Sequence, residues 1–366
     1  MHKLKTKQSL KGDRLLFFLP IALTLFGLFM IFSASSVAAL RDFNDKFYYL
    51  KHQAVWVLAG FFLFFFFSKI NLEVIRKYSV LFFLTTLLLL LLVLIPGIGV
   101  EVYGGRRWIE LGVFRFQPAE LAKLSLIIYF SNLFERKKDI IQFATITGLV
   151  LFLIMLEPDL GTAVIITSMA FCLYFVSGAP LDQVAKIAGA GLAVGPLLVF
   201  ASAYRRQRLM TFLNSSFDAQ GASYHIRQIL FALGSGGIFG RGLGQSRQKF
   251  LFLPEVTTDS IFAVIAEEFG FIGASLLILL FVLLLARGIK VAFLTKETFS
   301  RLLVTGIVFC VGIQAIINLG AMVALVPLTG VPLPFISYGG SSLLVCLSGM
   351  GIVYNVSRST QKWQKK

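Results

Sequence analysis

The sequence predicts an all-α integral membrane protein, because its composition, its long apolar runs and the placement of its basic residues all indicate a lipid environment. Apolar residues make up 57% of the 366 and charged residues 14%, whereas about a quarter of the residues of an average soluble domain are charged. We therefore expect one polytopic domain over 1–366. Its spans should be helical, because unpaired backbone groups are costly in hydrocarbon.

Ten apolar runs are candidate transmembrane helices. They lie near 15–37, 53–70, 78–96, 119–134, 140–156, 160–178, 184–203, 259–285, 302–327 and 336–357. The first follows a basic stretch, but it exceeds the core of a signal peptide, which is about 7–15 residues long, so we expect it to be retained. The fourth is short and contains Lys123, an ionisable residue that marks a candidate site.

Basic residues predict the orientation of the chain. With the N-terminus inside, the inner segments hold 20 Lys and Arg residues and the two short outer loops that contain any hold six. This asymmetry predicts that both termini are cytoplasmic. It also accounts for the net charge of +16, so we expect membrane lipids around the chain and no nucleic-acid partner.

One large extracytoplasmic loop, 204–258, is predicted between the seventh and eighth spans. The excess of Lys and Arg that marks cytoplasmic loops holds for short loops only, so the basic residues of this long loop do not contradict its outer position. An amphipathic helix is expected within it, because the apolar residues Ile226, Ile229, Leu230 and Leu233 share a helical face. The glycines that follow predict a flexible stretch before the eighth span.

The segment 104–123 is the first candidate site. Arg107 and Arg115 lie outside, and guanidinium groups suit phosphate. Glu120 and Lys123 are three residues apart and share a helix face. They form either an internal ion pair or part of a phosphate or sugar site.

Two aspartates at helix starts are further candidates. Asp159 lies in a short outer turn and is either a helix cap, a functional group or both. Asp259 lies where the long outer loop enters the eighth span. Asp259 or Thr258 could cap that helix, but a carboxylate beside a helix bundle also suits a general base. Deeper in this span, Glu267 and Glu268 could pair with Lys123 or another cation.

The sequence does not indicate a nucleotide, zinc or haem site. The glycine-rich GRGLGQS differs from the phosphate-binding GxxxxGK[ST] loop and follows no strand, so no nucleotide site is expected. The cysteines lie singly inside apolar runs without a histidine cluster, so we expect neither a zinc nor a haem site. Segment 328–342 contains Pro332, Pro334, Gly339 and Gly340, which predict a broken or re-entrant segment.

Four motifs together resemble the SEDS family of cell-wall proteins, which includes FtsW, RodA and SpoVE. They are RRWIELGVFRFQPAELAK, EPDLGTA, LPEVTTDSIFAVIAEEFG and PLPFISYGGSS. The stretch GSGGIFGRGLGQSRQKFLFLPE resembles the division branch, FtsW, more than the elongation branch, RodA. One departure is Thr257, where the family usually has a histidine that could help to position substrate.

The resemblance implies a peptidoglycan glycosyltransferase that polymerises lipid II on the outer face of the membrane, with Asp259 as the essential aspartate. It also implies a class B penicillin-binding protein as partner, other divisome membrane proteins, and a divalent cation, Mg or Mn, for which Asp259 is a candidate ligand. The candidate substrate-binding residues drawn from these motifs are Arg107, Arg115, Glu120, Lys123, Asp159, Lys249, Glu255, Ser337 and Gly339.

Three alternatives stay open at this point. A lipid II flippase would also have intramembrane charges and broken helices, although no inverted repeat, which many transporters show, is apparent. A scaffold that only recruits a transpeptidase would need no chemistry of its own. An elongation-type polymerase would differ in its cellular role.

Overall fold

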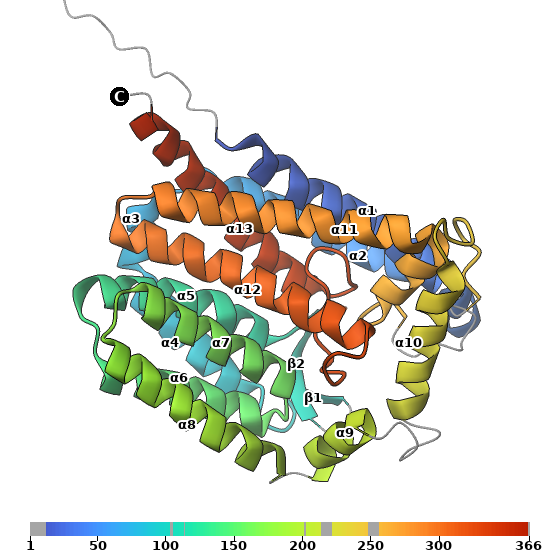
Figure 1. Ribbon diagram of the computed structural model, residues 1–366, viewed down its shortest axis with the longest axis horizontal. Coiled ribbons are helices and arrows are strands. Elements are labelled where there is room, and N and C mark those ends of the chain that lie inside the picture. Colours follow the sequence, from blue (N-terminus) through green and yellow to red (C-terminus); the bar gives the residue numbers. More distant parts are fainter. Residues whose placement is uncertain are drawn as a thin grey trace, which may run out of the picture.

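The chain folds into a bundle of helices with a small sheet at one end (Figure 1). The computed structural model describes residues 12–102, 105–112, 114–200, 203–213, 222–247 and 256–364. Its helices are α1 (Arg14–Phe43), α2 (Tyr48–Phe67), α3 (Leu72–Lys77), α4 (Ser79–Leu92), α5 (Pro118–Arg136), α6 (Ile140–Leu156), α7 (Leu160–Val176), α8 (Leu181–Phe200), α9 (Ala203–Leu213), α10 (Ala222–Gly236), α11 (Ile261–Leu294), α12 (Thr298–Met322) and α13 (Gly340–Gln364).

Each of the ten predicted apolar ranges coincides mainly with one helix, although 184–203 also reaches the first residue of α9. The predicted all-α membrane fold is confirmed in class. Among the described residues, five helices are long and apolar enough to cross a membrane, namely α1, α2, α11, α12 and residues 340–360 of α13. The helices α4, α6 and α7 are apolar but shorter. The number of spans, ten, stays a prediction.

Local signals explain where several helices begin. The carboxylate of Asp13 accepts a hydrogen bond from the backbone amide of Leu15 at 2.9 Å, and that of Asp139 accepts one from Ile141 at 2.9 Å. Pro118 occupies the first turn of α5, where its missing amide hydrogen costs nothing. These side chains satisfy or avoid the unpaired amide groups of a helix start.

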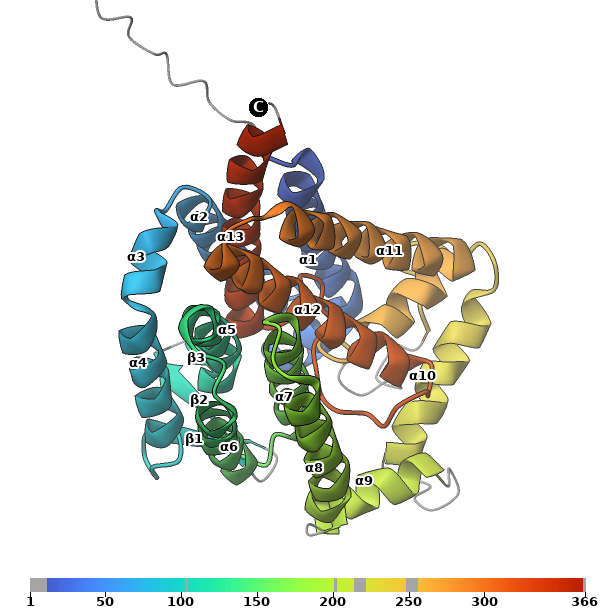
Figure 2. The same ribbon diagram turned by 60° about the vertical axis from the view of Figure 1, so that its left-hand side comes forward.

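The two termini of the described chain meet at one end of the bundle. The backbone amide of Asp13 donates to the hydroxyl of Ser357 at 3.0 Å, and the carboxylate of Asp13 pairs with Arg287 at 2.8 Å. The sheet, α9, α10 and the segment that precedes α13 lie at the opposite end (Figures 1 and 2). We call these the terminal end and the sheet end.

A three-stranded antiparallel sheet, which the sequence did not predict, joins α4 to α5. Its strands are β1 (Gly99–Val102), β2 (Gly105–Leu111) and β3 (Phe114–Phe116), in the order β1-β2-β3. A bulge between Val100 and Glu101 shifts the register of the first pair. The sheet lies against the turn between α6 and α7, because a Cβ atom at Gly105 would lie 2.7 Å from the carbonyl oxygen of Glu157.

The core lies where α12 and α13 pack against α2, α5 and α7 (Figure 2). Glycines allow close approach in this region, since a Cβ atom at Gly351 of α13 would lie 2.5 Å from the carbonyl oxygen of Phe64 in α2. In contrast, α2, α4, α8 and α11 expose many large apolar side chains, such as Phe62 and Leu192. This distribution agrees with a chain whose outer surface contacts lipid.

The segment predicted as one large loop contains two helices, α9 and α10, in its described parts. The expected amphipathic helix is α10, but only some of the apolar residues predicted to share its buried face are buried. Ile229 is buried, whereas Leu230 is 44% exposed.

The prediction of a flexible glycine stretch after α10 is wrong. The amides of Arg241 and Gly242 donate to the carbonyls of Glu267 and Glu268 at 3.0 and 3.1 Å. The stretch is packed against α11 at the point where Gly270, with φ 68°, interrupts that helix.

Candidate active site

Asp259 lies at the sheet end of the bundle, in the turn that leads into α11, and is partly exposed. The expectation that Asp259 or Thr258 caps α11 is wrong. The capping position is held by Ser260, whose side chain makes no capping hydrogen bond. Asp259 directly precedes this position, and its functional interpretation stays a prediction.

Asn318 of α12 fixes the backbone of this turn. Its side-chain amide donates to the carbonyl of Asp259 at 3.0 Å and to the carbonyl of Val331 at 2.8 Å. Asn318 is buried, so both bonds are shielded from water. The turn before α11 and the segment before α13 are thereby joined through one side chain.

Two further contacts complete the connection. The amide of Tyr338 donates to the carbonyl of Thr257 at 2.8 Å. A Cβ atom at Gly330 would lie 3.6 Å from an oxygen of the Asp259 carboxylate, and Gly330 has φ +74°. The proline- and glycine-rich segment thus forms one border of the space around Asp259, as a broken segment packed against protein.

His225 is a residue near this turn that the sequence analysis missed. Its Nε2 lies 2.7 Å from the hydroxyl of Ser260, next to Asp259. His225 belongs to α10, 35 residues away along the chain. A lone histidine in the outer loop gives no sequence signal for such a contact, which depends on how α10 packs against α11.

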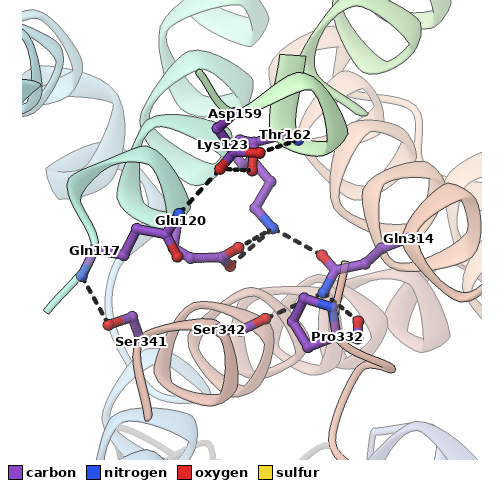
Figure 3. Close-up of polar contacts among 9 residues, drawn as sticks. All are labelled: Gln117, Glu120, Lys123, Asp159, Thr162, Gln314, Pro332, Ser341 and Ser342. Carbon is purple, nitrogen blue, oxygen red and sulfur yellow. Dashed lines mark hydrogen bonds and ion pairs between the residues drawn. The ribbon is translucent and has the colours of Figure 1, made fainter. Parts of the chain in front are cut away.

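Asp159 caps α7, as one interpretation predicted. Its carboxylate accepts hydrogen bonds from the amide and the hydroxyl of Thr162 at 3.0 and 2.8 Å (Figure 3). It also accepts a bond from the side-chain amide of Gln117 at 3.0 Å, and the backbone amide of Gln117 donates to Ser341 at 2.9 Å. Asp159 therefore links the starts of α5, α7 and α13.

Glu120 and Lys123 form an internal ion pair. The ammonium of Lys123 lies 2.8 Å from Glu120 and donates to Gln314 at 2.7 Å (Figure 3). Gln314 in turn donates to the carbonyl of Pro332 at 3.0 Å and to Ser342 at 3.1 Å. Lys123 is only 1% exposed, so its charge is paired with Glu120 in the interior of the bundle.

The two outer arginines have different surroundings. Arg107 donates to the carbonyls of Glu157 and Pro158 at 2.6 and 2.8 Å and so holds the turn between α6 and α7. Arg115 is exposed and pairs with Glu110 at 2.8 Å. Arg115 is therefore the more accessible of the two for an anionic substrate.

Glu157, in the turn between α6 and α7, was not singled out in the sequence. Its carboxyl group is completely buried, and neither oxygen has a hydrogen-bond partner among the described residues. Burial, together with the negative charge of Asp159, raises the pKa of Glu157 to about 9, against an opposing effect of Arg107. The group is therefore protonated at neutral pH.

Glu267 and Glu268 do not pair with Lys123, but Glu267 pairs with another cation, Arg241, as the alternative predicted. Glu267 accepts hydrogen bonds from the hydroxyl of Ser246 and the amide of Arg247, and Glu268 accepts bonds from Ser33 of α1. A salt bridge of 3.8 Å joins Glu267 to Arg241. Both glutamates hold α11 to neighbouring segments.

Of the remaining substrate-binding candidates, two lie in the segment before α13 and two lie outside the described residues. Ser337 is buried and its hydroxyl accepts the amide of Leu333 at 2.8 Å, within the segment before α13. Gly339 donates to Gln53 at 3.3 Å, and a Cβ atom there would meet open space. Lys249 and Glu255 lie outside the described residues.

The expected divalent cation would need several side-chain ligands near Asp259. In the part of the chain that the structure describes, no group of three or more His, Cys, Asp and Glu side chains is placed to hold an ion. The divalent cation therefore stays a prediction, with Asp259 as its candidate ligand.

Comparisons with known proteins give the same family as the motifs. The family model of the FtsW, RodA and SpoVE cell cycle proteins matches residues 13–362. Stage V sporulation protein E of Bacillus subtilis is 40% identical over 96% of this chain and 99% of its own length. The probable peptidoglycan glycosyltransferase FtsW of Geobacter sp. (strain M18) is 39% identical, with 94% of this chain and 96% of the relative covered.

Solved structures agree over nearly the whole chain. A chain of a peptidoglycan synthase complex that coordinates polymerization and crosslinking has a TM-score of 0.78 and 31% identity, covering 95% of this chain and 98% of that one. The rod shape determining protein RodA of Thermus thermophilus has a TM-score of 0.71 and 32% identity, covering 95% and 97%. In fold, in motifs and in the extent of the match, the chain belongs to the FtsW/RodA/SpoVE family of cell cycle proteins.

Proposed function

We propose that this protein is a peptidoglycan glycosyltransferase that polymerises lipid II at the outer face of the cytoplasmic membrane, with Asp259 as general base. The observation that carries the proposal is the partly exposed Asp259, whose backbone carbonyl is held by Asn318 at the end of the bundle opposite the termini. Relatives named as probable peptidoglycan glycosyltransferases support the activity.

The reaction would join two lipid-linked disaccharides. A sugar hydroxyl of the acceptor attacks the anomeric carbon of the donor, its proton passes to Asp259, and polyprenyl diphosphate leaves with the bonding electrons. A hydroxyl is a weak nucleophile, so a positioned base accelerates the attack. The diphosphate leaves readily once its charge is countered, so no acid has to protonate it.

Positive charge for the leaving group would come from the sheet end of the bundle. Arg115 is the candidate that the geometry favours, because it is exposed and held only by a surface ion pair with Glu110. Lys123 is committed to Glu120 and Gln314 in the interior, and we assign it a structural role.

The orientation follows from the basic residues and from the position of Asp259. With both termini cytoplasmic, the sheet end faces outward, where lipid II is presented. The polyprenyl chain would then lie between helices, open to lipid.

A role in septal synthesis, with a crosslinking partner, is the finer part of the proposal. The stretch 234–255 resembles FtsW, and several relatives carry that name. The structural relative in a peptidoglycan synthase complex supports a partner that supplies crosslinking, for which a class B penicillin-binding protein is the natural class. Other divisome membrane proteins would assemble around this pair.

The proposal is tested with fluorescent lipid II and the purified full chain, alone and with its transpeptidase partner. Asp259→Asn should abolish glycan polymerisation while the thermal unfolding temperature stays close to that of the wild type. Asp182→Asn, which removes an exposed carboxylate from the start of α8, is the matched control and should stay active. Near-normal polymer from the Asp259 variant would remove this residue from the role. Transfer of lipid II across liposomes without polymer would instead favour a flippase.

A further inference from the structure

A basic cavity lies at the terminal end of the bundle, on the side away from Asp259. Its volume is about 640 Å³, and it is lined by Glu73, Arg76, Lys77, Val80, Asn132 and Arg136. These residues come from α3, the start of α4 and the last turns of α5. Three of the lining side chains are cationic and one is anionic, so the cavity suits an anion.

The three cations are not equivalent. Arg76 is held by Glu135 at 2.6 Å and lies 3.6 Å from Glu73. Lys77 and Arg136 are exposed, and neither forms an ion pair with a described residue; the ammonium of Lys77 lies 5.6 Å from the centre of the Tyr78 ring, at the surface. Their charges are therefore available to a ligand, whereas Arg76 is a fixed part of the wall.

The cavity opens onto an apolar helix face. Val80 lines it and is 49% exposed, and Leu84 and Leu88 follow at intervals of four residues with exposures of 54% and 55%. This spacing places the three on one stripe of α4 that runs from the cavity toward the sheet end. A ligand with an anionic head and apolar chains would match both parts of the surface.

We propose that this cavity binds the phosphodiester headgroup of an anionic phospholipid, whose acyl chains lie along the exposed face of α4. Lys77 and Arg136 contact the phosphate. The ion pair of Arg76 with Glu135 and the side chain of Asn132 limit how deeply the headgroup enters the cavity. Basic cavities between helices near the cytoplasmic surface are a known means of headgroup recognition. The binding itself is independent of the proposed glycosyltransferase activity, and only the assignment to the cytoplasmic leaflet depends on the orientation given above.

The test uses the purified full chain and native mass spectrometry with phosphatidylglycerol or phosphatidylcholine of identical acyl chains. The wild type should retain phosphatidylglycerol preferentially. The double variant Lys77→Gln/Arg136→Gln should bind it roughly 30-fold more weakly, because each basic residue near an anionic headgroup contributes about a fivefold factor. Lys186→Gln/Lys290→Gln removes two exposed charges from α8 and α11 and should bind like the wild type.

A photoreactive phosphatidylglycerol locates the site even if the double variant folds poorly. Labelled peptides should cover residues 73–80 and 132–136 in the wild type. Equal retention of the two lipids, or labelling elsewhere, would overturn the inference. Displacement of the lipid by millimolar inorganic phosphate, with no dependence on acyl chains, would assign the cavity to a free anion and would also overturn it.

Discussion

Asn318 donates from one side-chain amide to the backbone carbonyls of Asp259 and Val331, at 3.0 and 2.8 Å. Asp259 precedes α11 and Val331 precedes α13, so a single buried side chain of α12 sets the distance between two segments that border the proposed site. The proposed base is thus positioned through its own backbone carbonyl.

Asn318→Ala should reduce glycan polymerisation by roughly tenfold to a hundredfold, because small displacements of a catalytic group are costly. The loss should fall on kcat more than on KM, since the variant keeps the substrate-binding surface. Each carbonyl left without a partner should also cost about 1–3 kcal/mol of stability. Steady-state kinetics with lipid II and thermal unfolding measure the two effects.

Asn355 provides a matched control for this variant. Its side-chain amide also bridges two carbonyls, those of Phe67 and Ile70 at 3.0 and 2.6 Å, but at the terminal end of the bundle. Asn355→Ala should lower stability without changing activity per folded molecule. If both variants lose activity in proportion to their stability, Asn318 has no positioning role.

Periodicity and charge are local properties, which is why the sequence predicted the helices and the cap at Asp159. Contacts made by distant segments were not predictable in the same way. The stretch expected to be flexible is packed, because the amide of Gly242 donates to the carbonyl of Glu268. Lys123 donates to Gln314, which lies nearly 200 residues away along the chain. The sheet was not predicted, because its short strands lie between two apolar runs, in a segment that the hydropathy pattern shows only as a polar loop.

Glu157→Gln should change how stability depends on pH. The folded-state pKa of Glu157 is raised from 4.5 to about 9 by burial, so its contribution to stability is fully present below pH 4.5 and is lost as the pH rises toward 9. Glutamine carries no charge at any of these values. The stability of the variant relative to the wild type should therefore rise by about 2–4 kcal/mol between about pH 4.5 and 7.5.

The measurement is the difference in unfolding temperature between variant and wild type across this range. Glu110→Gln, which removes an exposed carboxyl from β2, is the control and should give a profile parallel to that of the wild type. A parallel profile for the Glu157 variant would show that the buried carboxyl does not titrate as described.

Lys123→Met should destabilise the protein by about 3–5 kcal/mol, because it leaves the buried carboxylate of Glu120 without its counter-charge. The double variant Glu120→Gln/Lys123→Met should recover part of this loss, since neither charge is then buried alone. Lys186→Met, which breaks the exposed pair with Asp182, should cost less than about 1 kcal/mol. Equal costs for the two single variants would contradict the internal role of Lys123.

The packed glycine segment makes a separate prediction about α11. Gly240 has φ +83°, and a Cβ atom there would lie 2.2 Å from the carbonyl oxygen of Glu268, so Gly240→Ala should cost at least about 2 kcal/mol through backbone strain and displacement. Gly234→Ala, at a position in α10 with nothing within 4 Å, is the control and should be neutral or slightly stabilising. Because α11 begins directly after Asp259 and Ser260, a shift of its first turns should also lower polymerisation by Gly240→Ala. An active and fully stable Gly240 variant would show that this segment does not hold α11 in place.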